Sequence, residues 1–92
     1  MKIPNKFTLG ATKWVVKLVD HLDDTEQGRC DPKTATICIL KNKNHQIMEQ
    51  VYCHELIHAF TFSTGRVENH DEVAIDGQAH YLHQYLVETY KD

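Results

Sequence analysis

A run of apolar residues at helical spacing, from position 47 to position 59, constrains the fold of this chain more than any other feature. Within it stands the segment H-E-L-I-H, in which His54 and His58 are four residues apart. Positions i and i+4 lie on one face of an α-helix with Cβ atoms about 5–6 Å apart, so a helix here places both imidazoles side by side. The residues between them, Leu56 and Ile57, are apolar, as a helix packed on a core requires.

The second half of the chain is expected to hold two helices. Polar residues 42–44 supply N-cap candidates for the first helix, and Gly65 has the properties of a C-cap. The second helix is expected to begin near residues 69–71 and to continue towards Thr89. Its apolar stripe, spaced four, three and four residues apart, consists of Ile75, Ala79, Leu82 and Leu86.

Residues 7–40 are expected to be mainly extended. The β-branched run at 34–40 predicts a strand, and the run at 13–22 fits either a strand face or a helix face, with three valines that favour a strand. Residues 23–33 are polar, contain a glycine and a proline, and are expected to form a loop. The predicted fold is α+β: a small N-terminal antiparallel or mixed β-sheet of about three strands packed against two helices, the first of which carries H-E-x-x-H.

Length and composition limit the classes of protein to which this chain can belong. A chain of 92 residues forms one domain, 1–92, and 41% hydrophobic residues suit a globular core. Ten Lys and Arg against thirteen Asp and Glu, without a basic run, argue against a nucleic-acid binder driven by charge. No apolar run approaches the ~20 residues that cross a bilayer, and no export signal or C-x-x-C pair is present. These features predict reduced cysteines and a cytoplasmic location.

The H-E-x-x-H spacing predicts a zinc site. Two imidazoles on one helix face can both reach a Zn²⁺ ion at about 2.0–2.1 Å, so His54 and His58 are the first two candidate ligands. Glu55 lies beside that face and can reach a metal-activated water without binding the metal, which makes it the candidate general base. Zinc is inferred from the ligand type, since Mn²⁺ or Co²⁺ could occupy the same site.

A catalytic zinc usually has three protein ligands, and the second helix offers Glu72 and Asp76 at i and i+4. We expect Glu72 to bind the metal and Asp76 to accept the ring N–H of a ligating histidine. The main alternative has Asp76 as the ligand and Glu72 as a capping residue, and His70 is a third choice.

His80 and His83 continue the side of the second helix that carries Glu72 and Asp76. One of them could stabilise the oxyanion of a transition state or protonate a leaving amine. The alternative is that both are partly exposed helix histidines.

HELIH after a helical run and a β-branched strand resembles the small zinc peptidases of the ImmA/IrrE-like and SprT-like kind, many of which are encoded by phage and mobile elements. The third histidine of SprT-like proteins has no clear equivalent here. The segment E-V-A-I-D, residues 72–76, also resembles the E-x-x-x-D element of the gluzincins. That resemblance implies a glutamate that binds zinc and an aspartate that supports a histidine, and so a minimal zincin-like fold.

These observations together predict a zinc-dependent peptidase that hydrolyses peptide bonds in a peptide or protein substrate, with Glu55 as general base. An extended substrate is expected to add as a strand at a sheet edge, along residues 34–40. The alternative is a non-catalytic protein-interaction module of the same fold that binds zinc for stability. A fourth protein ligand such as His70, Cys53 or His80 would favour that alternative.

Overall fold

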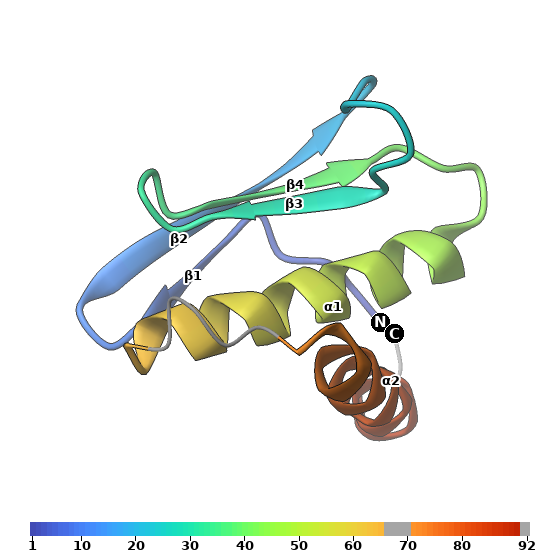
Figure 1. Cartoon of the computed structure of the whole chain (residues 1–92). Coiled ribbons are helices and arrows are strands. Elements are labelled where there is room, and N and C mark those ends of the chain that lie inside the picture. The colour runs from blue at the N-terminus through green and yellow to red at the C-terminus, as the bar shows by residue number, and fades with distance from the viewer. Residues whose placement is uncertain (66–70, 91–92) are drawn as a thin grey trace.

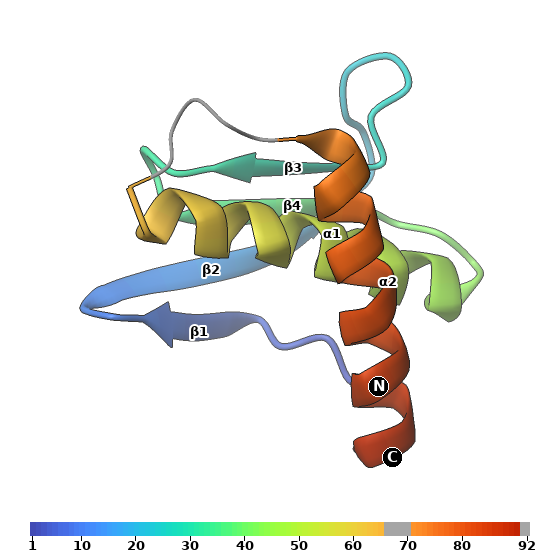
Figure 2. The same cartoon turned by 60° about the horizontal axis from the view of Figure 1, so that its bottom comes forward.

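The protein consists of a single sheet with both helices on one of its faces (Figure 1). We describe a computed structural model that covers residues 1–65 and 71–90. Its elements in chain order are β1 (Lys6–Leu9), β2 (Thr12–Val19), β3 (Gly28–Asp31), β4 (Thr36–Leu40), α1 (His45–Ser63) and α2 (Glu72–Thr89). Helix α1 lies against the sheet, and α2 crosses α1 on the side away from the sheet (Figure 2).

The sheet is mixed and has four strands in the order β1-β2-β4-β3. Strands β2 and β4 pair in parallel, whereas β1 with β2 and β3 with β4 pair antiparallel. The predicted α+β class, with a mixed sheet and two helices, is therefore confirmed, but the sheet contains one strand more than the three expected.

The additional strand is β3, which lies inside the segment 23–33 that was predicted to be a loop. Its sequence, G-R-C-D, has no intrinsic preference for a strand. Instead, the segment is a strand because its backbone pairs with β4, from Gly28 opposite Ile39 to Asp31 opposite Thr36. The same pairing makes β4 an inner strand, so the expectation that substrate adds along residues 34–40 is wrong. The exposed edges of the sheet belong to β1 and β3.

Strand β2 confirms the strand interpretation of its ambiguous run. Trp14 and Val16 point towards the helices and are buried, while the intervening Val15 is 42% exposed on the opposite face. This period of two residues is that of a half-buried strand. Gly10, at φ 58°, makes the tight turn from β1 into β2.

The core lies between the sheet and α1. Ile37 and Ile39 of β4 and Cys53 of α1 are its largest fully buried side chains. Burying a side chain of this size contributes about 1.5–3 kcal/mol. Cys53 is thus a core residue, whereas Cys30 and Cys38 are only partly buried.

A polar side chain caps the N-terminus of each helix, and the C-cap of α1 is Thr64, one residue before the predicted Gly65. Asn44 is the N-cap of α1 and accepts a hydrogen bond from the Gln46 N–H at 3.0 Å, and Gly65 follows the helix at φ 81°, a backbone conformation that favours glycine. Asp71 caps α2, of which Ile75 and Ala79 are buried against α1. Among the described residues, neither helix is long and apolar enough to cross a membrane.

Candidate metal centre

Helices α1 and α2 bring three metal-ligating side chains together where they cross. His54 Nε2 lies 3.1 Å from Glu72 Oε2, and His58 Nε2 lies 3.1 Å from Glu72 Oε1. The two imidazole rings stand 5.0 Å apart between centroids. One ligand atom from each residue falls within 4.8 Å of the other two, so the cluster is small enough to enclose a single ion.

The donor set fits Zn²⁺. Ligand atoms at about 2.0–2.2 Å around a tetrahedral ion are roughly 3.4 Å apart, close to the 3.1 Å that separates each imidazole nitrogen from the Glu72 carboxylate. Two imidazoles and one carboxylate are also the chemistry of a catalytic zinc site with a position left for water. The His54 side chain is 24% exposed and that of His58 is 12% exposed, so the cluster lies at a shallow depth that solvent reaches.

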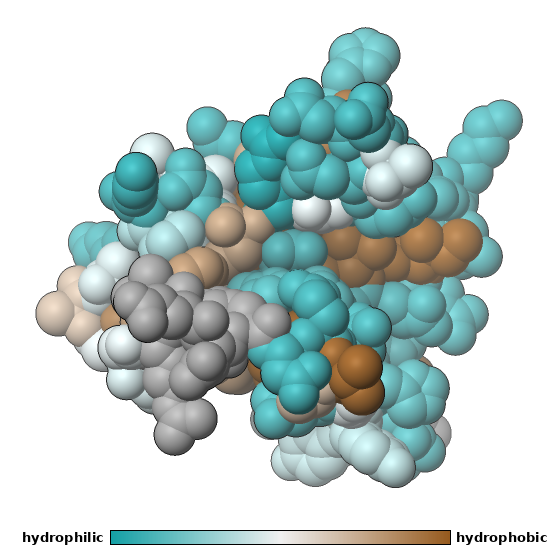
Figure 3. Space-filling view, in the orientation of Figure 1, coloured by the Kyte–Doolittle hydropathy of each residue, from teal (hydrophilic) through white to brown (hydrophobic). Residues whose placement is uncertain are grey.

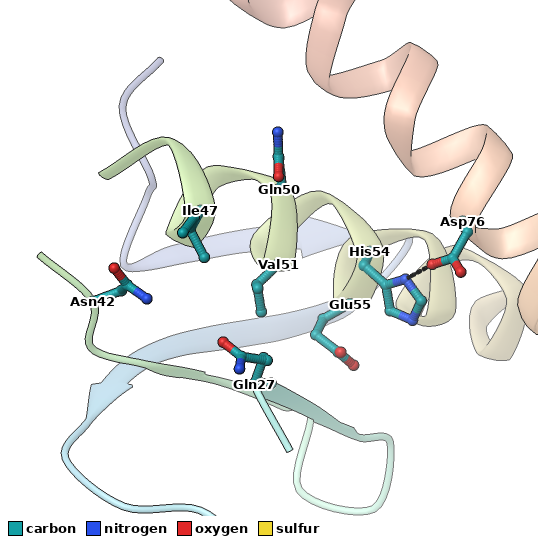
Figure 4. Close-up of a pocket in the computed structure, with 9 residues that line it drawn as sticks. Gln27, Asn42, Ile47, Gln50, Val51, His54, Glu55 and Asp76 are labelled. Atoms are coloured by element: carbon teal, nitrogen blue, oxygen red, sulfur yellow. Dashed lines mark ion pairs between the residues drawn. The ribbon is translucent and has the colours of Figure 1, made fainter. Parts of the chain in front are cut away.

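Asp76, one turn after Glu72, interacts with the other nitrogen of His54. Its Oδ1 lies 2.7 Å from His54 Nδ1 (Figure 4). Such a carboxylate holds the proton on Nδ1 and leaves the Nε2 lone pair directed at the cluster. This arrangement agrees with the predicted division of roles, in which Glu72 is a ligand and Asp76 supports the histidine.

The capping alternative for Glu72 is not supported by the geometry. Asp71 is the N-cap of α2, and its Oδ1 accepts a hydrogen bond from the Val73 N–H at 3.0 Å. Glu72 is the first helical residue, and its carboxylate faces the histidines. His70, the third choice for the ligand, lies outside the described residues.

Glu55 points from α1 towards β3, beside the cluster, and is only 8% exposed. Burial raises the pKa of Glu55 to about 7, although the charge of neighbouring His54 opposes this shift. A carboxylate whose pKa lies near neutrality is suited to both accepting and donating a proton.

Gly28 of β3 provides the room that Glu55 occupies. A Cβ atom at this glycine would lie 2.6 Å from Val51 Cγ1 and 3.0 Å from Glu55 Cγ. Sequence reasoning treated Gly28 only as a loop residue. No signal in the sequence connects it to α1, because the contact depends on the pairing of β3 with β4.

A cavity of about 580 Å³ opens next to this centre. Its lining combines Asp76 and His54 with residues from β3, α1 and the segments before them: Gln27, Gly28, Asn42, Ile47, Gln50, Val51 and Glu55. Figure 3 shows apolar surface in the hollow between the sheet and the first half of α1, bordered by hydrophilic surface. The candidate centre thus lies at one end of a groove that is open to solvent.

His80 and His83 lie away from the cluster. Both line a second cavity, together with Glu49. His83 is buried, and its Nε2 is 2.8 Å from Glu49 Oε1, while the α-amino group of Met1 donates to Glu49 Oε2 at 3.0 Å. The structure does not bring these two histidines to the candidate metal ligands.

Glu49 was not anticipated by the sequence reasoning, although the sequence holds a signal for it. It precedes the buried Cys53 by four residues, so it shares the inward face of α1 and needs buried partners. Burial raises the pKa of Glu49, but the hydrogen bonds from His83 and the α-amino group outweigh burial and hold the pKa below its usual range.

Two of the three candidates for a fourth protein ligand, Cys53 and His80, are not at the cluster, and the third, His70, lies outside the described residues. Cys53 is fully buried in the core, and His80 lines the second cavity. In residues 1–65 and 71–90, the group able to hold a metal ion contains His54, His58 and Glu72 only.

The chain matches no protein-family model, and no curated protein or solved structure shows significant similarity to it.

Proposed function

We propose that this protein is a zinc-dependent peptidase with a minimal zincin-like fold. The observation that carries the proposal is the convergence of His54 Nε2, His58 Nε2 and the Glu72 carboxylate, with the buried Glu55 beside them. Glu55 is not one of the three residues of the cluster, and burying its carboxyl group is costly. A hydrolytic site explains both its burial and its position.

Each residue of the candidate centre has a separate role in the proposed reaction. His54, His58 and Glu72 would hold the ion, which when bound acts as a Lewis acid that polarises a carbonyl and lowers the pKa of water. Glu55 accepts a proton from the attacking water and delivers it to the nitrogen of the leaving amine. Asp76 keeps the proton of His54 on Nδ1, so that Nε2 remains available as a ligand.

The outer edge of β3, which pairs with no further strand in residues 1–65 and 71–90, supports a peptide as the substrate. β3 is the outermost strand on the side of β4, and Gly28 at its start lies against Glu55. An extended peptide that pairs with this edge receives main-chain hydrogen bonds, and its backbone then passes the proposed general base. This edge replaces residues 34–40 as the proposed substrate strand.

Hydrolysis of an unstructured protein such as casein tests the proposal. The zinc-loaded wild type is expected to cleave it, and a chelator is expected to stop cleavage. Glu55→Gln should keep its zinc and lose about 10²–10⁴-fold in rate, the usual contribution of a general base. Glu88→Gln, the same substitution at an exposed position of α2, is the matched control. Equal rates for wild type and Glu55→Gln would contradict the proposal.

A further inference from the structure

The cavity next to Glu55 extends beyond the residues that take part in the proposed hydrolysis. From the metal centre it continues along α1 towards the start of that helix, past Val51 to Ile47 (Figure 4). The end remote from the metal centre, which we call the distal pocket, is lined by Gln27, Asn42, Ile47, Gln50 and Val51. These residues come from α1 and from the segments that precede β3 and α1.

The distal pocket carries no charge. All ionisable groups that line the cavity, namely His54, Glu55 and Asp76, belong to its metal-centre end. None of the basic residues next in sequence to this lining is part of it: Lys41 lies 3.3 Å from Asp20, Arg29 lies 2.8 Å from both Asp23 and Glu26, and Lys43 is exposed. A substrate carboxylate entering the distal pocket would therefore lose water without gaining a counter-ion from the lining.

The walls of the distal pocket suit a side chain with an apolar stem and an amide end. Ile47 and Val51 project from α1 towards the strand side, where the amides of Gln27 and Asn42 lie (Figure 4). Asn42 Oδ1 already accepts a hydrogen bond from the Asn44 N–H at 2.8 Å, which leaves its NH₂ group as a donor. The Gln27 amide has both a donor and an acceptor to offer.

Glutamine matches this set, because its two methylenes can cover the apolar wall and its amide both donates and accepts. Glutamate has the same shape but no donor at neutral pH, and it carries a charge. Alternate side chains of a strand point to the same side, so a peptide paired with β3 can direct one such side chain into the groove.

We propose that the distal pocket makes this protein select substrates with glutamine, rather than glutamate, at one position near the cleaved bond. The inference rests on the proposed peptidase function and names the class of substrate for that site. One hydrogen bond and the absence of a counter-ion together should separate the two side chains by about 10-fold, which corresponds to about 1.4 kcal/mol and lies within the range for an exchanged hydrogen bond.

Peptide binding to zinc-loaded Glu55→Gln, measured by fluorescence anisotropy, tests the pocket without turnover. Glutamine is moved through each position of a neutral peptide, and a second set carries glutamate instead. At one position the glutamine peptide is expected to bind about 10-fold more tightly. In the same background, Gln27→Lys supplies a counter-ion and should reverse the preference, whereas Gln27→Glu should increase it. The control is Gln78→Lys, the same charge change at an exposed α2 position that lines a different cavity. This control should leave the preference for glutamine unchanged.

Equal affinity for the two peptide sets at every position would overturn the inference, and so would equal effects of Gln27→Lys and Gln78→Lys. The proposed function fails separately. A wild type that prefers glutamine but never hydrolyses a peptide would refute the peptidase and leave the pocket in place. Hydrolysis without any preference for glutamine would refute the inference about the pocket and leave the proposed peptidase function in place.

Discussion

Gly28→Ala is the substitution that best tests how closely β3 approaches the proposed general base. The added Cβ would lie 2.6 Å from Val51 Cγ1, 3.0 Å from Glu55 Cγ and 3.1 Å from Glu55 Oε2. Real Cβ atoms do not tolerate the first of these distances, so either β3 or α1 must shift. Both are held by the sheet and the core, because Gly28 pairs with Ile39, which is fully buried.

The cost can be bounded from known overpacking effects. Forcing an extra carbon into a packed site costs about 1–3 kcal/mol, while replacing glycine in a strand returns roughly 0.5–1 kcal/mol of chain entropy. We therefore expect Gly28→Ala to lower the free energy of unfolding by about 1–2 kcal/mol. For a domain of this size that is a fall in Tm of about 4–16 °C, at 4–8 °C per kcal/mol.

Gly77→Ala provides a matched control with the opposite sign. Gly77 lies inside α2, where an added Cβ meets nothing within 4 Å. Alanine is preferred over glycine in a helix interior by about 0.8–1 kcal/mol, so this variant should melt above the wild type. Thermal unfolding followed by circular dichroism, with a chelator present throughout, measures both variants.

A double-mutant cycle with Val51→Ala identifies the cause. Removing Val51 Cγ1 removes the closest contact, so Gly28→Ala should cost less in the Val51→Ala background than in the wild type. If Gly28→Ala melts at or above the wild-type temperature, or if its cost is the same in both backgrounds, the described packing of β3 on α1 is wrong.

Three further predictions concern the metal centre and the buried cluster around Glu49. Glu72→Ala should weaken zinc binding in competition titrations, whereas Glu88→Ala at an exposed position should not, and equal affinities would exclude Glu72 as a ligand. Asp76→Asn should weaken zinc binding by about 10–100-fold while the folded structure is retained, and a loss as large as that of Glu72→Ala would instead favour Asp76 as the ligand. Because the folded-state pKa of Glu49 is held below its usual value of 4.5, its contribution to stability is present above that pH and is lost as the pH falls through the folded-state pKa. The stability advantage of the wild type over Glu49→Gln should accordingly shrink on acidification in chemical denaturation curves, and an advantage independent of pH would contradict this assignment.

Much of the candidate centre could be predicted because its geometry is local. The spacing of His54 and His58, and that of Glu72 and Asp76, each follows from the period of a single helix. The caps at Asn44 and Asp71 likewise depend on a few neighbouring residues. The non-local step was the expectation that Glu72 on the second helix meets the two histidines on the first, and Ile75 and Ala79 of α2 are buried where the two helices pack.

The features that sequence reasoning missed depend on contacts between distant segments. β3 has a polar sequence and is a strand because β4 lies beside it, and the role of Gly28 follows from that pairing. His83 was expected either to act at the centre or to be a partly exposed helix histidine, but it is buried, with its Nε2 2.8 Å from Oε1 of Glu49 on the other helix. A period of 3.6 residues assigns a face to each side chain but does not say which part of the neighbouring helix meets that face.

The most direct test of the central claim is anomalous diffraction at the zinc absorption edge from crystals of the zinc-loaded protein. We expect one peak per chain, about 2.0–2.2 Å from a nitrogen of His54, a nitrogen of His58 and an oxygen of Glu72. Asp76 should remain hydrogen-bonded to His54 Nδ1. A peak elsewhere, a fourth protein ligand closing the site, or no peak at this cluster would contradict the account.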